Sequence, residues 1–598
     1  MRRGTTAAAV AAVLVTGVLG SPAQAAAPAV EEALAANLPV HATDHALDWD
    51  AGDETTITLS GASAQVTGSG ASTRGGTVTI SAPGTYRVSG TLTDGALVVA
   101  SATDGVVRVV LDGASITSST TAPLQVLDAD EVVVVLADGS RNSLTDPAAY
   151  QYPEGQDEPN AALFSTADLT IAGSGALTVT ANANDGIASK DGLVVAGGEV
   201  TVHAADDGVR GKDYLVVAGG ALDVTATGDG LKADDDAPEA GFVHVAGGST
   251  RITSGDDGVA AASDVLVGDG SLEVRAGGGA GAGTDTGAKG IVGDVSVVIG
   301  GGSVAVDAID DAVHADDTIT VAGGDTTLAT AGDGVDAGER LVVTGGVLTV
   351  TASWEGLESK IVEISDGQLE VSAQDDAINA SDPVAPDSMD VLPGVHVAVS
   401  GGRLLLRTAV GDGLDSNGTA AVSGGTIVVD GSTEWVNSAL DVSGDFQVTG
   451  GVVVGTSHGG HVAVPSTASP QAWVSLTAQP QQAAGTLLHV LAPDGTVVAS
   501  LRTSKTQGNV TVSTPAVRAG TQYRLAVGGT ADGPTLGGYH EQPGDATGAT
   551  VVVTATSNTP PPEGGWGGGW PGGGGWPGGG GGGGGWPPPG GGWPPARG

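Results

Sequence analysis

The sequence predicts an all-β protein whose main part is a right-handed, single-stranded parallel β-helix with a small C-terminal β cap and a disordered tail. Three observations carry this prediction. From Ala161 to about Gly455 a unit of about 22 residues recurs, and each unit contains three short strand-like runs. All but one of the units also place an acid at one fixed position, in most cases followed by a small residue and then Val, Ile or Leu. Stacked units of this kind bury the apolar side chains that one unit alone leaves open.

One unit, from Asp207 to Ala226, shows how a coil is expected to form. Leu215–Val217 is a short β-branched run, and Leu222–Ala226 alternates apolar and polar residues, which is typical of strands. The Gly219-Gly220 pair between them predicts a turn. A helical solenoid is disfavoured by the 102 glycines, and a propeller would need a repeat of about 40 residues.

The acid that opens each unit, here called the corner residue, is the best candidate for chemistry. The corner residues expected from the repeat are Asp185, Asp207, Asp229, Asp257, Lys289, Asp311, Asp333, Glu355, Asp376, Asp412 and Glu434. Equivalent positions in successive coils should lie about 4.8 Å apart, so these carboxylates repel one another unless a cation lies between them. Oxygen donors at such spacing suit Ca²⁺.

Calcium ligands are therefore predicted at the corners and at the acids or amide that precede them. The predicted ligands are Asn184, Asp185, Asp206, Asp207, Asp229, Asp256, Asp257, Asp310, Asp311, Asp333, Asp375, Asp376 and Asp412. The alternative is that Asp-Gly is only a turn pair, with basic residues as counter-charges, such as Lys212 paired with Asp234 of the next coil. Lys289 at a corner argues against calcium in its own coil.

The rest of the chain divides by composition. Residues 1–25 read as an export signal, with Arg2 and Arg3 before an apolar run and Ala23-Gln24-Ala25 as the cleavage site. Residues 26–41 are predicted as a linker, 42–160 as irregular β-helix coils with an excursion at 147–160, and 161–463 as regular coils. Residues 464–557 are predicted as a β cap or small β module, and 558–598 as a disordered Gly/Pro/Trp-rich tail. A secreted or cell-surface monomer is expected, without a transmembrane segment.

The charge limits the partners. A formal net charge of -46 opposes binding to nucleic acid and favours cations. The absence of cysteine excludes disulfides, thiolate metal sites and cysteine nucleophiles. The tryptophans of the tail provide a possible cell-wall contact, and the alternative is a spacer without a specific ligand.

The repeated Asp-Asp-Gly-Val/Ile corner, followed by Leu-Val-Val-Ala-Gly-Gly, resembles the secreted carbohydrate-binding domain-containing family of the clostridial cellulose- and polygalacturonate-binding type. Gly84–Gly90 resembles the opening segment of that family, and the resemblance covers roughly residues 42–529. It implies a β-helix similar to pectate lyases, calcium ions at its turns, and binding of plant cell-wall polysaccharide. Lys289, Glu355 and Glu434 depart from the pattern at the corner.

Three functions remain open from the residues. A polysaccharide-binding protein would stack sugars on aromatic side chains, for which Trp354 and Trp435 are the candidates; each could instead be a local packing residue. A Ca²⁺-dependent polysaccharide lyase would need a base, and Lys212, Arg210 and Lys190 are the candidates; a ladder of salt bridges is the alternative for them. The third function is a structural surface or adhesion protein.

Overall fold

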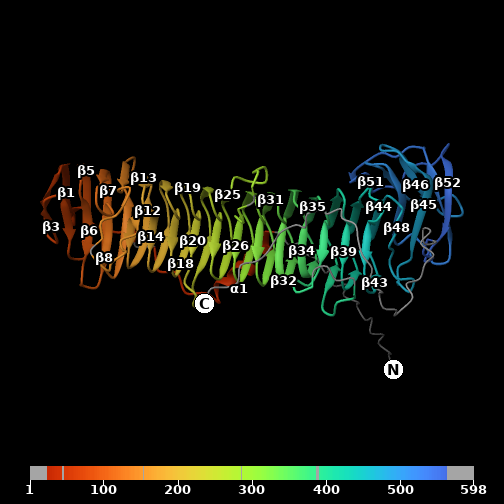
Figure 1. Ribbon diagram of the computed structural model, residues 1–598, viewed down its shortest axis with the longest axis horizontal. Helices are drawn as coiled ribbons and strands as arrows, with labels where there is room; N and C mark the ends of the chain where they lie inside the picture. The colour runs from red at the N-terminus through yellow and green to blue at the C-terminus, as the bar shows by residue number, and fades with distance from the viewer. Residues whose placement is uncertain (1–22, 44–45, 153, 285, 386–389, 562–598) are drawn as a thin grey trace, which may run out of the picture. The chain divides into compact units, whose positions relative to one another are not determined.

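The computed structural model describes residues 23–43, 46–152, 154–284, 286–385 and 390–561. It confirms a parallel β-helix: strands of equivalent position in successive coils pair side by side along the solenoid (Figure 1). The register is that of a coil stacked on the next, because Leu193 pairs with Leu215 and Leu215 with Val243. Residues 1–22 of the predicted signal peptide and residues 562–598 of the predicted tail lie outside the described residues, whereas Ala23–Ala25, predicted as the cleavage site, belong to the first helix. Within the described residues, no helix is both long and apolar enough to cross a membrane.

Three walls run along the solenoid, and each coil contributes one strand to each wall. The first wall, which follows the corner, contains β4 (Thr77–Ile80), β6 (Ala96–Ala100), β8 (Leu124–Asp128), β11 (Ala161–Ser165), β14 (Asp185–Ser189), β17 (Val209–Gly211), β20 (Leu231–Ala233), β23 (Val259–Ala261), β26 (Ile291–Gly293), β29 (Val313–Ala315), β36 (Ile378–Ala380), β39 (Leu414–Ser416) and β42 (Leu440–Val442). Two longer strands, β32 (Val335–Val343) and β34 (Leu357–Ile364), run through both the first and the second wall.

The second wall contains β9 (Glu131–Leu136), β12 (Asp168–Gly173), β15 (Gly192–Val195), β18 (Tyr214–Val217), β21 (Phe242–Val245), β24 (Asp264–Val267), β27 (Ser296–Ile299), β30 (Thr318–Val321), β37 (His396–Val399), β40 (Thr419–Val422) and β43 (Phe446–Val448). The third contains β10 (Arg141–Thr145), β13 (Ala176–Ala181), β16 (Glu199–Ala204), β19 (Ala221–Ala226), β22 (Ser249–Ser254), β25 (Ser271–Ala276), β28 (Ser303–Ala308), β31 (Asp325–Thr330), β33 (Val347–Ala352), β35 (Gln368–Ala373), β38 (Arg403–Thr408), β41 (Thr426–Asp430) and β44 (Val452–Ser457). Strands β5 (Gly84–Leu92) and β7 (Val106–Thr117) each pair along more than one wall.

The core is the inside of the solenoid, a continuous column of Val, Leu and Ile side chains from Ile57 to Val453. Alternation along the third wall shows how it forms: in β19 the side chains of Leu222 and Val224 point inward and are buried, whereas that of Asp223 is exposed. The second glycine of the Gly-Gly turn, Gly220, has φ +80°, so the turn between the second and third walls needs a residue without a Cβ.

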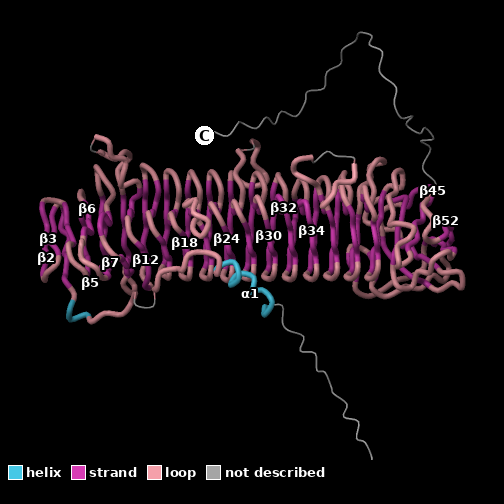
Figure 2. Tube along the Cα trace, turned by 90° about the horizontal axis from the view of Figure 1, so that it is seen from below, coloured by secondary structure: helices cyan, strands magenta, loops and turns pink. Residues whose placement is uncertain are grey.

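The N-terminal segment differs from the predicted linker. Helix α1 (Ala23–Leu34) lies against the outer face of the second wall (Figure 2). The side chain of Val30 packs there on Leu266 and Val298. Further along, the backbone N–H and Nδ1 of His41 lie 3.0 and 2.8 Å from the hydroxyl of Tyr214. The segment lies here because the outer face of this wall is apolar and has to be covered. A 3₁₀ turn, Ala51–Asp53, leads into the first strands.

Both ends of the solenoid are covered by antiparallel strands. At the N-terminal end, β1 (Thr55–Gly61) pairs with β2 (Ser63–Thr67), and β3 (Ala71–Arg74) pairs with β4. At the C-terminal end, β45 (Trp473–Gln482) and β48 (Gln507–Ser513) continue the sheet of β44 in antiparallel fashion. A separate six-stranded sheet is formed by β46 (Leu487–Leu491), β47 (Val497–Arg502), β49 (Gln522–Val527), β50 (Thr535–Leu536), β51 (Tyr539–His540) and β52 (Thr550–Thr556). Such ends protect strand edges that would otherwise be free to pair.

The last coil corrects one expectation. The sequence repeat places a corner at Glu434, but Leu414 pairs with Leu440 and Asp415 with Asp441, so the equivalent of Asp412 is Ser438. Four extra residues lie in the turn between β41 and β42, which includes Glu434 and Trp435. The 22-residue spacing holds only where the turns have their usual length. The four inserted residues therefore shift Glu434 out of register with the corner column.

Candidate acidic strip and cation sites

The corner residues form one column along the first wall, and the residues three positions later form a second. The strand registers align the corner column as Asp185, Asp207, Asp229, Asp257, Lys289, Asp311, Asp333, Glu355, Asp376, Asp412 and Ser438. They align the second, the plus-three column, as Ala188, Arg210, Lys232, Ala260, Val292, His314, Asp336, Glu358, Asn379, Asp415 and Asp441. The two columns together are called the acidic strip below.

The corner aspartates bind the backbone of the next coil. Oδ1 of Asp207 accepts a hydrogen bond from the N–H of Asp229 at 3.0 Å, and Oδ1 of Asp311 accepts one from the N–H of Asp333 at 2.9 Å. The same bond joins the other corners, from Asp229, Asp257, Asp333, Asp376 and Asp412 to the residue that follows each in the column. The corner aspartate is therefore a turn residue, as the alternative reading of Asp-Gly expects, but its partner lies in the next coil. Its second oxygen, Oδ2, is left for a cation.

In the N-terminal half of the strip, basic side chains occupy this position. Nζ of Lys232 lies 2.7 Å from Oδ2 of Asp229 and 3.2 Å from Oδ2 of Asp207. Burial opposes the charge of Lys232, but its hydrogen bond to Asp229 and the nearby carboxylates outweigh burial and raise its pKa. Asp185 lies 3.8 Å from a guanidinium nitrogen of Arg210.

Lys289 plays the same part from a corner position. Its Nζ lies 2.9 Å from Oδ2 of Asp310 and also forms an ion pair with Oδ2 of Asp311. The ammonium group of Lys289 thus contacts Asp310 and Asp311, two of the predicted calcium ligands. This agrees with the expectation that a lysine at the corner disfavours calcium in this coil. Around Asp229, by contrast, carboxylate oxygens of Asp229, Asp256 and Asp257 lie within 4.8 Å of one another.

The C-terminal half of the strip carries acids without such partners. Among the residues that the structure describes, no lysine or arginine forms an ion pair with Asp333, Glu355, Glu358, Asp376, Asp412 or Asp415. Burial is the main cause that raises the pKa of Asp333 to about 8, of Asp376 to about 7 and of Asp415 to about 8. Burial also raises the pKa of Glu355 above its usual range and the pKa of Asp412 to about 6. Neighbouring carboxylates add to each shift, so these groups must hold protons or share a cation.

Asn379 shows that this half of the strip suits a hard cation. Its Nδ2 donates to Oε2 of Glu355 at 2.7 Å, which directs the amide into the strip between Glu358 and Asp415. The side chain is 8% exposed, and its Oδ1 has no hydrogen-bond partner among the described residues. A buried carbonyl oxygen without a partner is costly, and amide and carboxylate oxygens are the ligands that calcium takes.

The residues before the corners differ in their surroundings. Nδ2 of Asn184 donates to the backbone carbonyl of Asn160 at 2.8 Å, so the side-chain amide stabilises the backbone of the preceding coil. Burial raises the pKa of Asp206 and of Asp375. Asp375 follows Trp354 in this column, because the N–H of Asp375 donates to the carbonyl of Trp354 at 2.9 Å.

Both tryptophans proposed from the sequence are exposed. Trp354 precedes the corner Glu355 and is 52% exposed; Trp435 is 47% exposed and lies in the inserted turn, three residues before Ser438. Trp435 therefore does not flank a corner, contrary to the reading of the repeat. Both still belong to coils in the C-terminal half of the strip.

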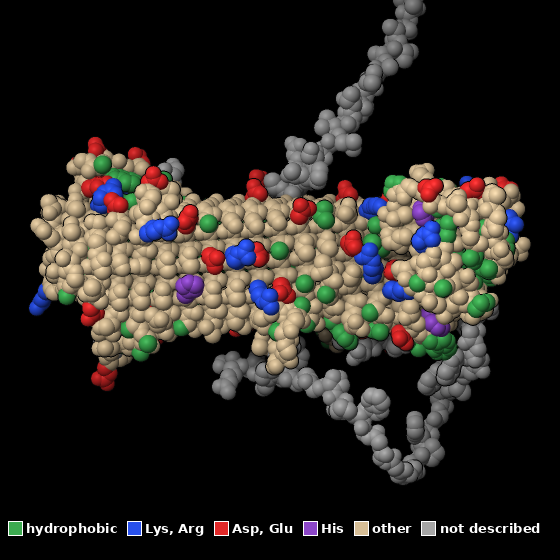
Figure 3. All heavy atoms as spheres, turned by 90° about the horizontal axis from the view of Figure 1, so that it is seen from above, with side chains coloured by type: hydrophobic (Ala, Val, Ile, Leu, Met, Phe, Trp, Pro, Cys, Tyr) green, Lys and Arg blue, Asp and Glu red, His purple; other side chains and the backbone are tan. Residues whose placement is uncertain are grey.

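The three residues proposed as lyase bases form ion pairs. Arg210 pairs with Asp234, Lys212 Nζ lies 2.6 Å from Asp235, and Lys190 pairs with Glu158. The expected partner of Lys212 is wrong by one residue, because Asp234 faces Arg210. The hydrogen bond to Asp235 raises the pKa of Lys212, opposite to the shift that makes a lysine a general base. Similar pairs occur on the face seen in Figure 3, where Lys and Arg side chains lie beside Asp and Glu.

Sequence reasoning missed the plus-three column. Asp336, Glu358, Asn379, Asp415 and Asp441 were absent from the predicted ligands. The signal was present, because the third residue after each corner is basic at Arg210 and Lys232 and is an acid or an asparagine from Asp336 onward. It is visible only when this column is compared coil by coil.

Comparison with known proteins places the chain in context. A family model described as "Carbohydrate-binding domain-containing protein" matches residues 74–334 and 329–516. A protein of the same description from Acetivibrio thermocellus is 43% identical over 128 residues, which are 21% of this chain and 45% of that protein. The alignment thus spans less than half of that relative. A solved structure, the polysaccharide lyase-like protein from C. thermocellum as a gadolinium derivative, is 28% identical, with 48% of this chain and 96% of that one covered and a TM-score of 0.35.

Proposed function

We infer that this chain, which belongs to the carbohydrate-binding domain-containing family, is a secreted, non-catalytic protein that binds polysaccharide of the plant cell-wall type, such as cellulose or pectin. The observation that supports the proposal is that two features lie in the same half of the acidic strip. The half of the acidic strip whose corner carboxylates pair with no lysine or arginine of the described residues is also the half whose coils carry two exposed tryptophans, Trp354 and Trp435.

We place the calcium ions of this protein in the C-terminal half of the strip. The residues that would hold them are Glu355, Glu358, Asp376, Asn379, Asp412 and Asp415, whose donors are all oxygens. Bound calcium would neutralise this charge and offer open positions to hydroxyl or carboxylate groups of a glycan. An acidic polymer such as pectin needs such neutralisation to approach a chain of net charge -46.

The tryptophans would provide the contact with the sugar rings. An exposed indole offers an apolar face on which a pyranose ring can stack. Trp354 and the turn that holds Trp435 are three coils apart, which corresponds to roughly 15 Å along the solenoid. A stretch of a few sugar units spans that length, so one glycan chain could contact both.

A binding assay with insoluble polysaccharides tests this function. The full chain should co-sediment with cellulose or with pectin in calcium and lose affinity in chelator, while a surface or adhesion protein without glycan affinity would stay in solution under both conditions. The same incubations with soluble pectate, followed by the absorbance of unsaturated uronides, test the lyase alternative. No absorbance increase is expected, and clear product formation would overturn the non-catalytic assignment.

A further inference from the structure

We propose that His314, Asp311 and Asp336 form a site for a divalent transition metal ion of the zinc class, separate from the calcium ligands placed further along the strip. The three side chains come from adjacent coils, at the point where the plus-three column changes from basic to acidic. This inference does not depend on the polysaccharide assignment.

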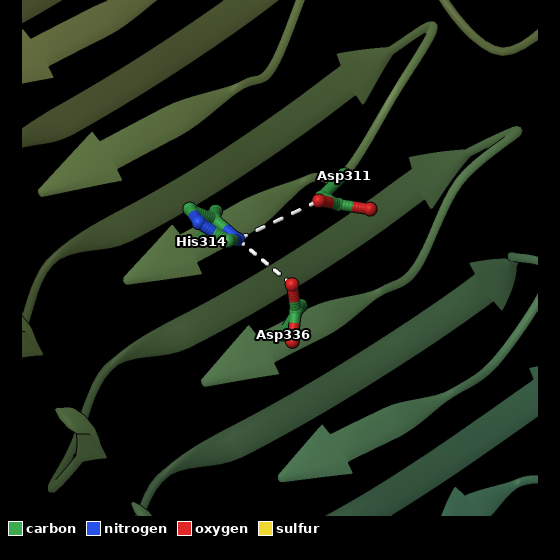
Figure 4. Close-up of side chains that lie close together, drawn as sticks. All are labelled: Asp311, His314 and Asp336. Carbon is green, nitrogen blue, oxygen red and sulfur yellow. Dashed lines mark hydrogen bonds and ion pairs between the residues drawn. The ribbon is translucent and has the colours of Figure 1, made fainter. Parts of the chain in front are cut away.

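The donor atoms lie at the spacing of a small metal centre (Figure 4). Nδ1 of His314 lies 2.8 Å from Oδ2 of Asp336 and 3.6 Å from Oδ2 of Asp311, and one donor of each residue lies within 4.8 Å of the others. Zinc–nitrogen and zinc–oxygen bonds of about 2.0–2.2 Å at tetrahedral angles place donors roughly 3.4 Å apart, so small side-chain movements suffice.

Surrounding groups orient the donors. Nε2 of His314 lies 3.3 Å from Oδ1 of Asp316, so an Nε2–H can donate to that carboxylate and leave the Nδ1 lone pair facing Asp311 and Asp336. A carboxylate on the far nitrogen is the usual way in which proteins orient a metal-binding histidine. Oδ1 of Asp311 is held by the N–H of Asp333, which leaves Oδ2 on the side of the imidazole.

The imidazole determines the class of ion. Calcium prefers six to eight oxygen donors, whereas an imidazole nitrogen with two carboxylates suits zinc and its neighbours. All three side chains are mostly buried, with exposures of 21% for His314, 8% for Asp311 and 27% for Asp336. The remaining exposure leaves room for one water or ligand atom as a fourth donor.

Lys289 competes with the metal. Its ammonium group contacts Oδ2 of Asp311, the oxygen that the ion would use, and Asp310 holds it from the other side. Asp294 is the other titratable group near the imidazole. Metal binding therefore requires Lys289 to shift toward Asp310, and removal of its charge should strengthen binding.

The test is a titration of the full chain with ZnCl₂ in excess calcium, followed calorimetrically, and with CoCl₂, followed by visible absorbance. The wild type should bind one equivalent that calcium does not displace. His314→Gln and Asp336→Asn should abolish it, Lys289→Met should tighten it, and the control His203→Gln, on exposed β16 surface, should leave it unchanged.

The exposed Asp316 gives a second test that does not endanger the fold, because its side chain is 75% exposed. Asp316→Asn should weaken zinc binding by about 10- to 100-fold while the circular dichroism spectrum stays the same. The proposal is overturned if zinc does not bind in excess calcium, or if His314→Gln or Asp316→Asn binds it as tightly as the wild type does.

Discussion

Each corner aspartate uses its two carboxylate oxygens for different tasks. Oδ1 accepts the N–H of the following corner, as between Asp207 and Asp229, and so satisfies a backbone donor at the turn. Oδ2 is free to meet a cation, which at that coil is the ammonium group of Lys232. The same aspartate side chain therefore holds the turn and interacts with the cation. Loss of either the backbone hydrogen bond or the cation should lower the free energy of unfolding.

The Lys232 bridge gives the first prediction. Lys232→Met leaves Asp207 and Asp229 facing each other without a counter-charge. The free energy of unfolding should fall by about 2–3 kcal/mol, less than the roughly 3–5 kcal/mol of a fully buried pair because Lys232 remains partly exposed. Calcium should restore part of this loss, measured by chemical denaturation with and without the ion.

The matched control for Lys232 is Arg251→Met, which removes an exposed pair with Glu273. Surface ion pairs contribute little, so a change of at most about 1 kcal/mol without any calcium response is expected. Equal effects of the two substitutions would contradict the role given to Lys232.

The buried acids give a pH prediction. Burial raises the pKa of Asp333 and Asp415 to about 8 and of Asp376 to about 7, while unfolded carboxyls titrate near pH 4. Between these values the folded state binds more protons than the unfolded state, so without calcium the stability falls as pH rises. In chelator the Tm should drop from pH 5 to pH 8, and calcium should reverse the drop.

The doubly substituted Asp376→Asn, Asp415→Asn protein is the control for this pH dependence. Neutral amides do not titrate, so its Tm in chelator should change less between pH 5 and pH 8, and calcium should raise it less. A wild-type Tm that rises between pH 5 and pH 8 in chelator would contradict the raised pKa values of these buried acids.

At the scale of elements, the Gly-Gly turn closes each coil. A Cβ at Gly220 would lie 2.6 Å from the carbonyl oxygen of Gly198, and its φ of +80° is unfavourable for other residues. Gly220→Ala should cost about 1–3 kcal/mol in unfolding free energy. Gly281→Ala, in a loop with open space around it, should be nearly neutral in the same denaturation experiment.

Helix α1 is the element that sequence patterns did not reveal. Its contacts with Leu266 and Val298 depend on an apolar outer face of the second wall. The strand pattern of the sequence predicts only that apolar side chains of this wall face the core, so it does not predict a helix outside. Val30→Asp should release the helix and increase hydrogen exchange in β24 and β27. Unchanged exchange there, with a folded solenoid, would show that α1 does not protect this wall.

The sequence predicted the coil well because strand, turn and corner recur in each unit, and repetition makes register visible. It could not predict which acid is the corner of the last coil, since the inserted turn displaces Glu434 and leaves Ser438 in that place. It also paired Lys212 with Asp234 where the structure pairs it with Asp235, because side-chain direction at a turn is not fixed by spacing.

For the whole molecule, the acidic strip changes character along the solenoid axis. Toward the N-terminus, Arg210, Lys232 and Lys289 neutralise the corners from within the chain. Beyond His314 the same columns carry acids and Asn379. A fold built from equal units thus contains one half in which basic side chains meet most corner carboxylates and one half in which, among the described residues, lysine and arginine do not. Asp257, whose pKa is raised by burial to about 6, is the exception in the first half. We place polysaccharide binding on the second half.

If the C-terminal half of the acidic strip is the glycan-binding face, its exposed tryptophans determine the affinity that a depletion isotherm on the insoluble polysaccharide measures. Trp354→Ala combined with Trp435→Ala should lower the affinity more than about tenfold in calcium, with Tm unchanged, since both side chains are exposed. The control pair Arg251→Met and Gly281→Ala should bind like the wild type. Wild-type affinity in the double tryptophan variant, equally strong in chelator, would show that the glycan binds elsewhere on the chain and without calcium.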